Sequence, residues 1–381
     1  MKRDEKKIWF LGLSSLFNDI GSEMIALILP FFVTALGGGG IAIGSLSGLR
    51  EGLASIVKLF SGWYSDKVGK RMPFVFLGYF ISVLFRFLLV LSNSWQTILI
   101  FMSLERFGKA RDAPRDAIIS VSTKRYGHGF GIQQMLDTSG AILGSMLVLF
   151  LFWKFQLGFK TIILIAASLS IFSLVPLFFV KEPKTKPIKK SLFSGIKYIS
   201  KELKYFIFVA SVFTFANFGL YMLLLLRAKQ ITGSLITAIA LGVLFNFIWA
   251  FFTIPFGNLS DIIGRKKVLI IGYALLSFVG LGFIYSSSLI YLIVLFILFG
   301  FVYAITQANQ RALVSDLSGK MKATAFGFFQ FVIGIVAIAG GIIAGFLWNI
   351  SPKIMFVYIT LVAALSTILL LFVKSSSKLK N

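Results

Sequence analysis

The stretch GWYSDKVGKR at residues 62–71 returns in altered form as GNLSDIIGRK at residues 257–266. Both copies follow the pattern G-x-x-S-D-x-x-G-[KR]-[KR], and each lies between two long apolar blocks. Arg115 follows the first copy at nearly the same distance as Arg311 follows the second. The chain is therefore predicted to contain two copies of one unit in the same orientation.

The apolar blocks around these motifs are long enough to cross a membrane. Hydrophobic residues make up 57% of the 381-residue chain and charged residues only 14%, whereas soluble proteins average about 25% charged residues. A helix needs about 20 apolar residues to cross a bilayer core of roughly 30 Å. The sequence therefore predicts an all-α integral membrane protein with twelve spans. These are residues 8–36, 41–63, 73–91, 95–121, 129–152, 158–180, 205–227, 235–256, 268–286, 289–313, 323–348 and 353–373.

The net charge of +24 is distributed unevenly along the chain. Lys and Arg concentrate in the segments on one side of successive predicted spans, which is the positive-inside pattern of membrane proteins. The charge therefore indicates topology and a lipid-bilayer environment, and we expect no nucleic-acid partner. We predict a multi-pass protein of the cell membrane with both termini in the cytoplasm. The first apolar block is too long for a cleavable signal peptide and is interpreted as the first span.

The sequence offers little chemistry for an enzyme. It has no Cys and a single His, His128, in a short basic segment. It also lacks a His-Glu-x-x-His metal site and the phosphate-binding loop through which ATP would drive transport. We therefore expect no metal, no cofactor and no enzymatic activity.

The duplicated ten-residue pattern resembles the cytoplasmic loop signature of the major facilitator superfamily. The resemblance implies that fold, in which twelve helices form two six-helix halves around a central cavity. A pseudo-twofold axis along the membrane normal relates the halves. We expect them at residues 1–180 and 205–381, because the Lys- and Pro-rich segment 181–204 lies midway along the chain as a cytoplasmic linker. The resemblance also implies a monomer that works by alternating access.

Two weaker resemblances favour the multidrug/proton antiporters of this superfamily. LERFGKARDAP at residues 104–114 resembles the arginine motif of span 4, with Arg106 in the arginine position but without the usual Gln-Gly pair. The glycines of span 5 have the spacing of the antiporter motif, but Ser145 stands where that motif has a proline. The antiporter motif is therefore degraded in this chain.

The repeated loop motif is interpreted as a cytoplasmic gate. Its glycines would allow tight turns at helix ends, and its basic pair would anchor the loop at the lipid headgroups. Asp66 needs a partner, and Arg115 should reach the same membrane face, roughly 30 Å along span 4. We hypothesise that these charges latch the cytoplasmic side in the outward-facing state; the alternative is that they only anchor the topology. The predicted gate consists of Gly62, Asp66, Gly69, Lys70, Arg71 and Arg115, with the counterparts Gly257, Asp261, Gly264, Arg265, Lys266 and Arg311.

Charged side chains inside the predicted spans form a second candidate site. Charges at mid-bilayer are costly, so they normally face a cavity, pair with each other and mark a transport pathway. Asp19 and Glu23 lie one turn apart on a span without a cation, so we predict that this pair carries the proton, with Asp137 as second choice. In the alternative interpretation, Arg50 or Arg86 holds these acids in fixed ion pairs. The predicted proton-coupling and substrate residues are Asp19, Glu23, Arg50, Glu51, Arg86, Glu105, Arg106 and Asp137.

Small and polar side chains suggest how the spans pack and what they hold. Glycines recur at every fourth position on span 2 (44, 48 and 52) and span 11 (341 and 345), a spacing that lets helices approach closely. In the resembled fold these two spans meet. The second half has few acids inside its spans, but its amides among aromatic residues could hold an amphipathic solute. These amides are Asn217, Asn246, Gln307, Asn309, Gln310 and Gln330.

Taken together, these patterns predict a secondary transporter that exports a small amphipathic compound in exchange for protons. A proton-coupled symporter or a uniporter for a polar solute, such as a sugar or an organic anion, is the alternative. A membrane-embedded enzyme or a non-transporting receptor is disfavoured, because neither needs paired gate motifs. The expected partners are a small-molecule substrate, protons and the lipid bilayer.

Overall fold

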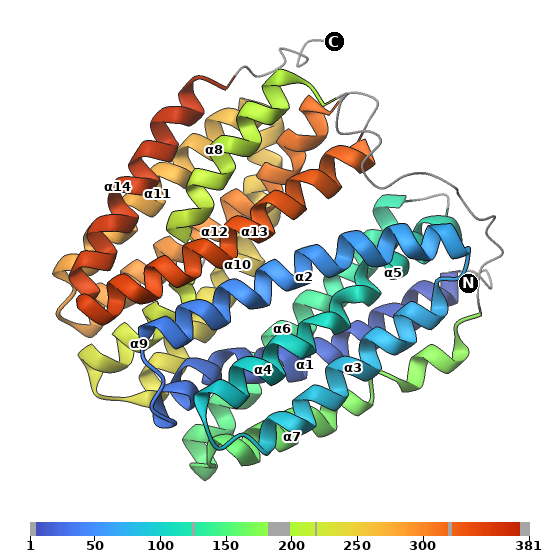
Figure 1. Cartoon of the computed structure of the whole chain (residues 1–381), viewed down its shortest axis with the longest axis horizontal. Helices are drawn as coiled ribbons and strands as arrows, with labels where there is room; N and C mark the ends of the chain where they lie inside the picture. Colours follow the sequence, from blue (N-terminus) through green and yellow to red (C-terminus); the bar gives the residue numbers. More distant parts are fainter. Residues whose placement is uncertain (1–4, 124–125, 182–198, 218, 319–321, 374–381) are drawn as a thin grey trace. The chain divides into compact units, whose positions relative to one another are not determined.

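A computed structural model of the chain describes residues 5–123, 126–181, 199–217, 219–318 and 322–373 (Figure 1). Over these residues the fold is all-α, with fourteen α-helices and two 3-10 helices. The helices of the N-terminal part are α1 (Glu5–Ala35), α2 (Gly40–Val68), α3 (Met72–Val90), α4 (Trp95–Glu105), η1 (Arg106–Arg111), α5 (Asp112–Ser122), α6 (Tyr126–Phe155), α7 (Phe159–Ile171) and η2 (Val175–Phe179). The remaining helices are α8 (Lys201–Asn217), α9 (Leu220–Thr232), α10 (Leu235–Ile263), α11 (Arg265–Tyr285), α12 (Leu289–Leu317), α13 (Lys322–Ile350) and α14 (Pro352–Leu371).

The twelve predicted spans all coincide with helical segments, which confirms the all-α membrane fold. Ten segments in the described part of the chain are long and apolar enough to cross a membrane. The other two predicted spans are α2 and the α4–η1–α5 segment. The helix α2 carries Arg50, Glu51 and Lys58 among glycines and serines, which lowers its hydropathy. The second segment is interrupted at η1, so no continuous long helix forms there.

The predicted span 95–121 is helical throughout, but the type of helix changes part-way along it. The α-helix stops at Glu105, and the chain tightens into a 3-10 helix before α5 begins. A side chain at Gly108 would lie 2.1 Å from Ser82 Oγ and 2.7 Å from the carbonyl oxygen of Gly78. The backbone at Gly108 therefore approaches α3 closely where the type of helix changes. This change lies before the proline at residue 114.

A second break occurs in the predicted span 205–227. The helix α8 ends at Asn217, and α9 begins at Leu220. Between them Gly219 has φ +89°, in the left-handed region that favours glycine. The span is therefore two helices, and the end of α8 lies inside the transmembrane part of the chain.

Contacts divide the chain into two compact units. The first contains residues 1–38 and 53–191, and the second contains residues 39–52 and 192–381. The helix α2 is thus shared, because its residues up to Gly52 group with the second unit. Residues 182–198 of the predicted linker lie outside the described residues, and the halves 1–180 and 205–381 remain a prediction.

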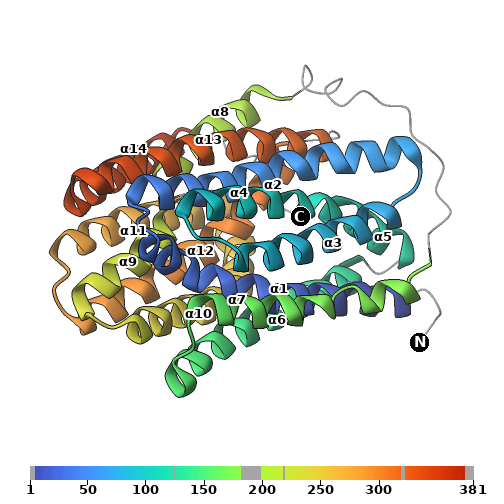
Figure 2. The same ribbon diagram turned by 60° about the horizontal axis from the view of Figure 1, so that its bottom comes forward.

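The first unit is built around α1 and α3. The helix α1 packs against α6, α7 and η2, while α3 packs against α4, η1 and α7 (Figure 2). A buried apolar cluster at one end includes Ile8 and Leu11 of α1, Tyr79 of α3 and Ile118 of α5. Long apolar helices bury such clusters while their remaining faces carry exposed hydrophobic side chains, as expected for a protein surrounded by lipid.

The second unit has its own helical core. The helix α11 packs against α12 and α14, α8 packs against α13 and α14, and α10 packs against α12 (Figure 1). The N-terminal part of α2 lies directly on α13, since a Cβ at Gly44 would be 2.0 Å from the carbonyl oxygen of Gly341. The backbone N–H of Gly40 donates to Asn349 Oδ1 at 2.6 Å. The predicted close packing of spans 2 and 11 through glycine is confirmed.

Candidate functional site

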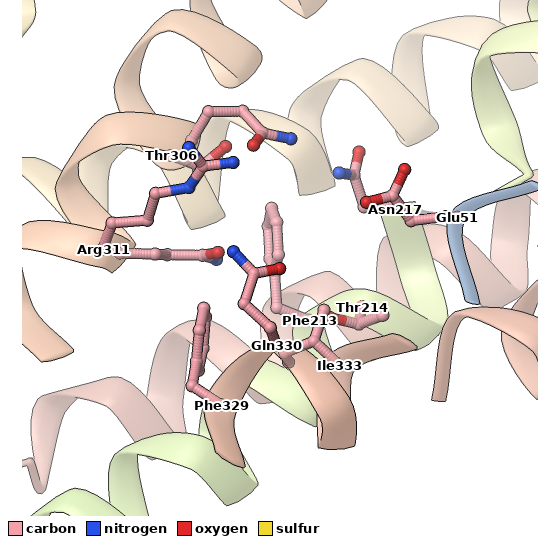
Figure 3. A pocket seen from close by; sticks show the side chains of 11 residues that line it. Glu51, Phe213, Thr214, Asn217, Thr306, Arg311, Phe329, Gln330 and Ile333 are labelled. Carbon is pink, nitrogen blue, oxygen red and sulfur yellow. The ribbon is translucent and has the colours of Figure 1, made fainter. Parts of the chain in front are cut away.

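A polar pocket lies inside the second unit (Figure 3). It forms where α8, α12, α13 and the N-terminal part of α2 converge. The volume of this pocket is about 40 Å³, and roughly 10–15 Å³ of such volume holds one water molecule. The lining side chains are Glu51, Phe213, Thr214, Asn217, Thr306, Gln307, Gln310, Arg311, Phe329, Gln330 and Ile333.

The acidic side chain and the basic side chain of the pocket lie at separate ends. In Figure 3 Glu51 and Asn217 lie side by side, Arg311 lies on the other side, and Gln330 projects between them. Asn217 is 3% exposed and its Oδ1 has no hydrogen-bond partner among the described residues. The guanidinium of Arg311 forms no ion pair within the described part of the chain. One end therefore presents oxygen acceptors and the other presents N–H donors.

Tyr273 of α11 supports the pocket from behind. Gln310 Nε2 donates to its hydroxyl oxygen at 2.8 Å. The ring of Phe213 stacks on Tyr273 with centroids 3.9 Å apart and an interplanar angle of 13°. Both lining side chains are therefore held by a fully buried tyrosine, and the pocket wall is ordered by packing and one hydrogen bond.

Four of the amides that the sequence singled out line this pocket, and the structure adds an acid to them. Gln307, Gln310 and Gln330 are joined by Asn217, whereas Asn246 and Asn309 are buried elsewhere and do not line it. Glu51 comes from α2, far away in the sequence. The sequence indicated few acids inside the spans of the second half, and that interpretation missed the exposed Glu51 that span 2 contributes to this pocket.

The first unit holds a buried ion-pair network centred on Arg86. Its Nη1 donates to the carbonyl oxygen of Asn18 at 2.9 Å and to Ser170 Oγ at 2.7 Å. Its Nη2 lies 3.2 Å from Glu105 Oε1, and Arg106 contacts the other oxygen of Glu105. Arg86 and Glu105 are almost fully buried. Glu105 thus lies between two guanidinium groups, which is the arrangement of a structural ion pair.

Asp19 and Asp137 are neighbours in the first unit. Their carboxylates are close enough to repel each other, and Lys109 and Arg111 also act on Asp19. A Cβ at Gly140 would lie 3.2 Å from Asp19 Cβ, so α6 approaches α1 closely beside this pair. Asp19 accepts from Asn18 Nδ2 at 2.9 Å, and Asp137 accepts from Gln133 Nε2 at 2.6 Å.

The remaining charged candidates occupy the two units separately. Glu23 is half-buried on α1, one turn beyond Asp19. Arg50 is half-buried on α2 and belongs to the second unit together with Glu51. The structure places the first-choice acid Asp19 within electrostatic range of Asp137, a residue 118 positions away in the sequence, and no sequence signal indicates that proximity.

The first copy of the gate motif forms a different ion pair from the expected one. Asp66 pairs with Arg71 at 3.0 Å, whereas Arg115 pairs with Asp116 at 2.9 Å and donates to Ser15 Oγ. Arg71 Nη1 also donates to the carbonyl oxygen of Ala117 at 3.2 Å. The link between the loop and span 4 therefore exists, but Arg71 makes it instead of an Asp66–Arg115 pair.

The predicted roles of the motif glycines are partly wrong. Gly69 has φ +74° and ends α2 in a tight turn as predicted, while Lys70 follows it as an exposed loop residue. Gly62, however, lies within α2, and a Cβ there would touch Ala113 Cβ at 3.0 Å. The helix α2 continues through the Ser-Asp-Lys-Val sequence, because helical hydrogen bonds satisfy the backbone N–H and C=O groups there. The helix then ends at Gly69. Gly62 therefore permits close packing instead of a turn.

The second copy repeats the local pattern of the first. Asp261 pairs with Arg265 at 2.8 Å, and Arg265 Nε also contacts Asp316 at 2.9 Å. Lys266 Nζ donates to the carbonyl oxygen of Leu371 at 2.7 Å. Gly264 has φ +99° and ends α10, whereas Gly257 lies inside that helix. The expected partner of Asp261, Arg311, lines the polar pocket instead.

Comparison with known proteins identifies the family. The sequence profile described as Major Facilitator Superfamily matches residues 11–249 and 206–381. The chain belongs to the major facilitator superfamily. It is therefore a multi-pass secondary transporter and not an enzyme, as the duplicated loop motif had indicated.

Three similar proteins extend this result. An uncharacterized MFS-type transporter of Methanocaldococcus jannaschii is 48% identical over 378 residues, which cover 97% of this chain and 95% of the relative. The multidrug resistance protein MdtH of Blochmanniella pennsylvanica is 26% identical over 233 residues, or 59% of this chain and 56% of that protein. The crystal structure of a mutant of the nucleoside transporter NupG matches with a TM-score of 0.82 at 15% identity, covering 96% of this chain and 99% of that one.

Proposed function

We propose that this transporter exports a small amphipathic compound in exchange for protons, and that Asp19 and Asp137 carry the proton. The observation that supports this most directly is the electrostatic repulsion between the two acids, which lie near the α1–α6 crossing. Two neighbouring carboxylates are difficult to ionise together, so one of them is suited to binding and releasing a proton.

The neighbourhood of this acid pair distinguishes it from Glu105 and Asp116. Glu105 is compensated by Arg86 and Arg106 at contact distance, and Asp116 is compensated by Arg115. No ion pair within 4.0 Å fixes Asp19 or Asp137 among the described residues. A carboxylate outside a fixed ion pair can gain and lose a proton without breaking the structure.

Two observations support export of an amphipathic compound. The pocket combines amides with the aromatic walls of Phe213 and Phe329, a mixture of surfaces suited to a solute with polar and apolar parts. Relatives described as multidrug resistance proteins match about half of the chain. The alternative is proton-coupled uptake of a polar solute, which the charged ends formed by Glu51 and Arg311 favour.

The test is transport by the purified protein in liposomes with an imposed pH gradient. Cationic dyes, sugars and organic acids are compared as substrates, and the direction of net movement separates exchange from symport. We expect Asp19→Asn and Asp137→Asn each to abolish movement driven by the gradient while exchange without a gradient persists. The matched control is Glu202→Gln, because Glu202 is exposed in the first turn of α8. Undiminished pH-driven transport by either Asp variant would contradict the proposal.

We further propose that the paired motifs Asp66–Arg71 and Asp261–Arg265 act as the cytoplasmic gate and that both termini are cytoplasmic. The same pair of residue types forms an ion pair at the end of α2 and of α10, at 3.0 Å and 2.8 Å. Each pair is partly exposed, so it can open at small cost when the cytoplasmic side rearranges.

A further inference from the structure

We propose that the pocket of the second unit recognises an amphoteric solute, with its ammonium group beside Glu51 and Asn217 and its anionic group at Arg311. This inference rests on the proposed transport function and names the class of substrate. It depends on three features of the pocket, namely a free acceptor, a helix end and a separated guanidinium.

At the Glu51 end of the pocket, a buried amide oxygen without a hydrogen-bond donor lies beside a carboxylate. Asn217 Oδ1 is buried and has no hydrogen-bond partner among the residues that the structure describes. Figure 3 shows the carboxylate of Glu51 directly beside the Asn217 amide. A buried acceptor without a donor is unfavourable, so a bound group with N–H donors would be stabilised there. Because one of the two acceptors is a carboxylate, a positively charged donor fits best.

The break after α8 adds negative potential at the same end. Asn217 is the last residue of α8, and Gly219 turns the chain away in a left-handed conformation. The final carbonyl groups of a helix lack intrahelical donors and carry a partial negative charge. Glu51, the Asn217 amide oxygen and this helix end thus make one site for a cationic group.

The other end of the pocket suits an anion. Arg311 is exposed to the pocket and no described acid lies within ion-pairing distance of it. A guanidinium remains charged under all ordinary conditions and binds carboxylates through two parallel hydrogen bonds. Gln330 extends between the two ends and offers a donor and an acceptor.

The walls between the ends define the body of the solute. Phe213 and Phe329 flank the pocket, and both rings are buried. The present volume of about 40 Å³ is far below the roughly 300–1,000 Å³ of sites that enclose drug-sized ligands. The charged groups can therefore be recognised in this arrangement, whereas the apolar body is accommodated only when the walls separate during transport.

The experiment uses four matched ligands and needs no gradient. 4-(Aminomethyl)benzoic acid carries both charges at opposite ends of an aromatic ring. Its methyl ester carries only the ammonium group, its N-acetyl derivative only the carboxylate, and the N-acetyl methyl ester neither. Binding to the purified full chain is measured by titration calorimetry. We expect 4-(aminomethyl)benzoic acid to bind at least tenfold more tightly than each of the other three.

Two variants assign the ends of the pocket. Glu51→Gln should remove the advantage of a free ammonium group, so that 4-(aminomethyl)benzoic acid and its N-acetyl derivative bind equally. Arg311→Gln should remove the advantage of a free carboxylate, so that 4-(aminomethyl)benzoic acid and its methyl ester bind equally. Glu202→Gln, in an exposed position outside the pocket, should change none of the four affinities.

Several outcomes would overturn the proposal. These are four affinities within twofold of each other, no detectable binding of 4-(aminomethyl)benzoic acid, or an equal effect of both variants on all ligands. A titration with sodium chloride against choline chloride provides a further arm. Saturable sodium binding that Glu51→Gln abolishes, without any preference for the ammonium ligands, would assign this end to an inorganic cation instead.

Failure of this inference can be distinguished from failure of the proposed function. Asp19→Asn lies in the other unit and should retain the full order of the four affinities while losing pH-driven transport. Normal binding with normal transport in that variant would contradict only the proton-coupling proposal. If the unmodified protein transports its substrate but does not show the expected order of the four affinities, only the proposed substrate class would be contradicted.

Discussion

Arg86 joins four helices of the first unit through one guanidinium group. It projects from α3, and its partners Asn18, Ser170 and Glu105 come from α1, α7 and α4. All of these contacts are buried. The carboxylate of Glu105 compensates the positive charge of Arg86, and the same carboxylate also pairs with Arg106. The network is best viewed as the attachment point for these helices.

The first prediction concerns this network. Glu105→Gln removes the negative charge between two buried guanidinium groups, so we expect the protein to lose about 3–5 kcal/mol of stability. The measurement is the midpoint of thermal unfolding in detergent. Glu202→Gln is the surface control and should leave the midpoint unchanged. An equal effect of both variants would show that Glu105 is not essential to the network.

A second prediction compares the two members of the gate pair. Asp66 has a side chain that is 44% exposed, whereas the side chain of Arg71 is only 11% exposed and also binds the carbonyl oxygen of Ala117. Asp66→Asn should therefore cost less than about 1 kcal/mol. Arg71→Met should cost about 1.5–3 kcal/mol more than that, because it also removes a charged hydrogen bond.

Unfolding midpoints of these two variants in detergent check the order. The corresponding comparison in the second copy is Asp261→Asn against Arg265→Met, since Arg265 contacts both Asp261 and Asp316. If the acid variants were the more damaging in both copies, the arginines would not be the linking residues.

Sequence reasoning identified charged residues more successfully than their partners. Arg86 and Glu105 were recognisable because a charge within a long apolar block is costly in any arrangement of the helices. Their contact with each other, and the proximity of Asp19 to Asp137, depend on how each helix is rotated about its axis. Neighbouring spans share no sequence periodicity that specifies this rotation. The pairing of Asp66 with Arg71 was missed because the short-range partner competes with the distant Arg115.

Between elements, glycine allows the N-terminal part of α2 to lie on α13. A Cβ at Gly44 would be 2.0 Å from the carbonyl oxygen of Gly341, and a Cβ at Gly341 would be 2.3 Å from that of Gly44. Helix backbones in contact gain dispersion energy along their length, which is the main source of helix association in lipid.

A third prediction follows from this contact. Gly44→Ala forces the two helices apart, and we expect a loss of about 1–3 kcal/mol. Gly131→Ala is the matched control, because Gly131 lies in α6 and a Cβ there would meet nothing within 4 Å. The control should gain about 0.5–1 kcal/mol, since alanine loses less backbone entropy in a helix than glycine does. Equal unfolding midpoints in detergent would argue against a tight crossing.

The breaks within elements were beyond the sequence. Apolar periodicity in a lipid-exposed chain does not distinguish a continuous helix from two helices of the same total length. The 3-10 segment Arg106–Arg111 and the turn at Gly219 are both set by neighbouring helices that come close at a glycine. The turn at Gly69 was recognisable because glycine there is followed by two basic residues and a proline, all typical of a helix end.

On the scale of the whole molecule, the topology can be tested directly because the chain contains no Cys. With both termini in the cytoplasm, the segment between α11 and α12 should be extracellular and the start of α8 cytoplasmic. Ser287→Cys and Glu202→Cys place one thiol at exposed positions in these segments. A membrane-impermeant maleimide added to intact cells should label only the first variant.

The control for this experiment is labelling of opened cells. Both variants should react after the cells are opened, which shows that each thiol is accessible. Labelling of the Glu202 variant in intact cells, with protection of the Ser287 variant, would invert the proposed topology.

The shared helix α2 has a mechanical consequence for the transporter. It is a single helix, yet its residues up to Gly52 belong to one compact unit and the rest belong to the other. Any movement of one unit against the other must therefore either bend α2 near Leu53 or separate its first turns from α13. Both deformations store elastic or interfacial energy. We expect the bound solute to supply that energy, so the stiffness of this one helix should contribute to the barrier between successive states and to the turnover rate.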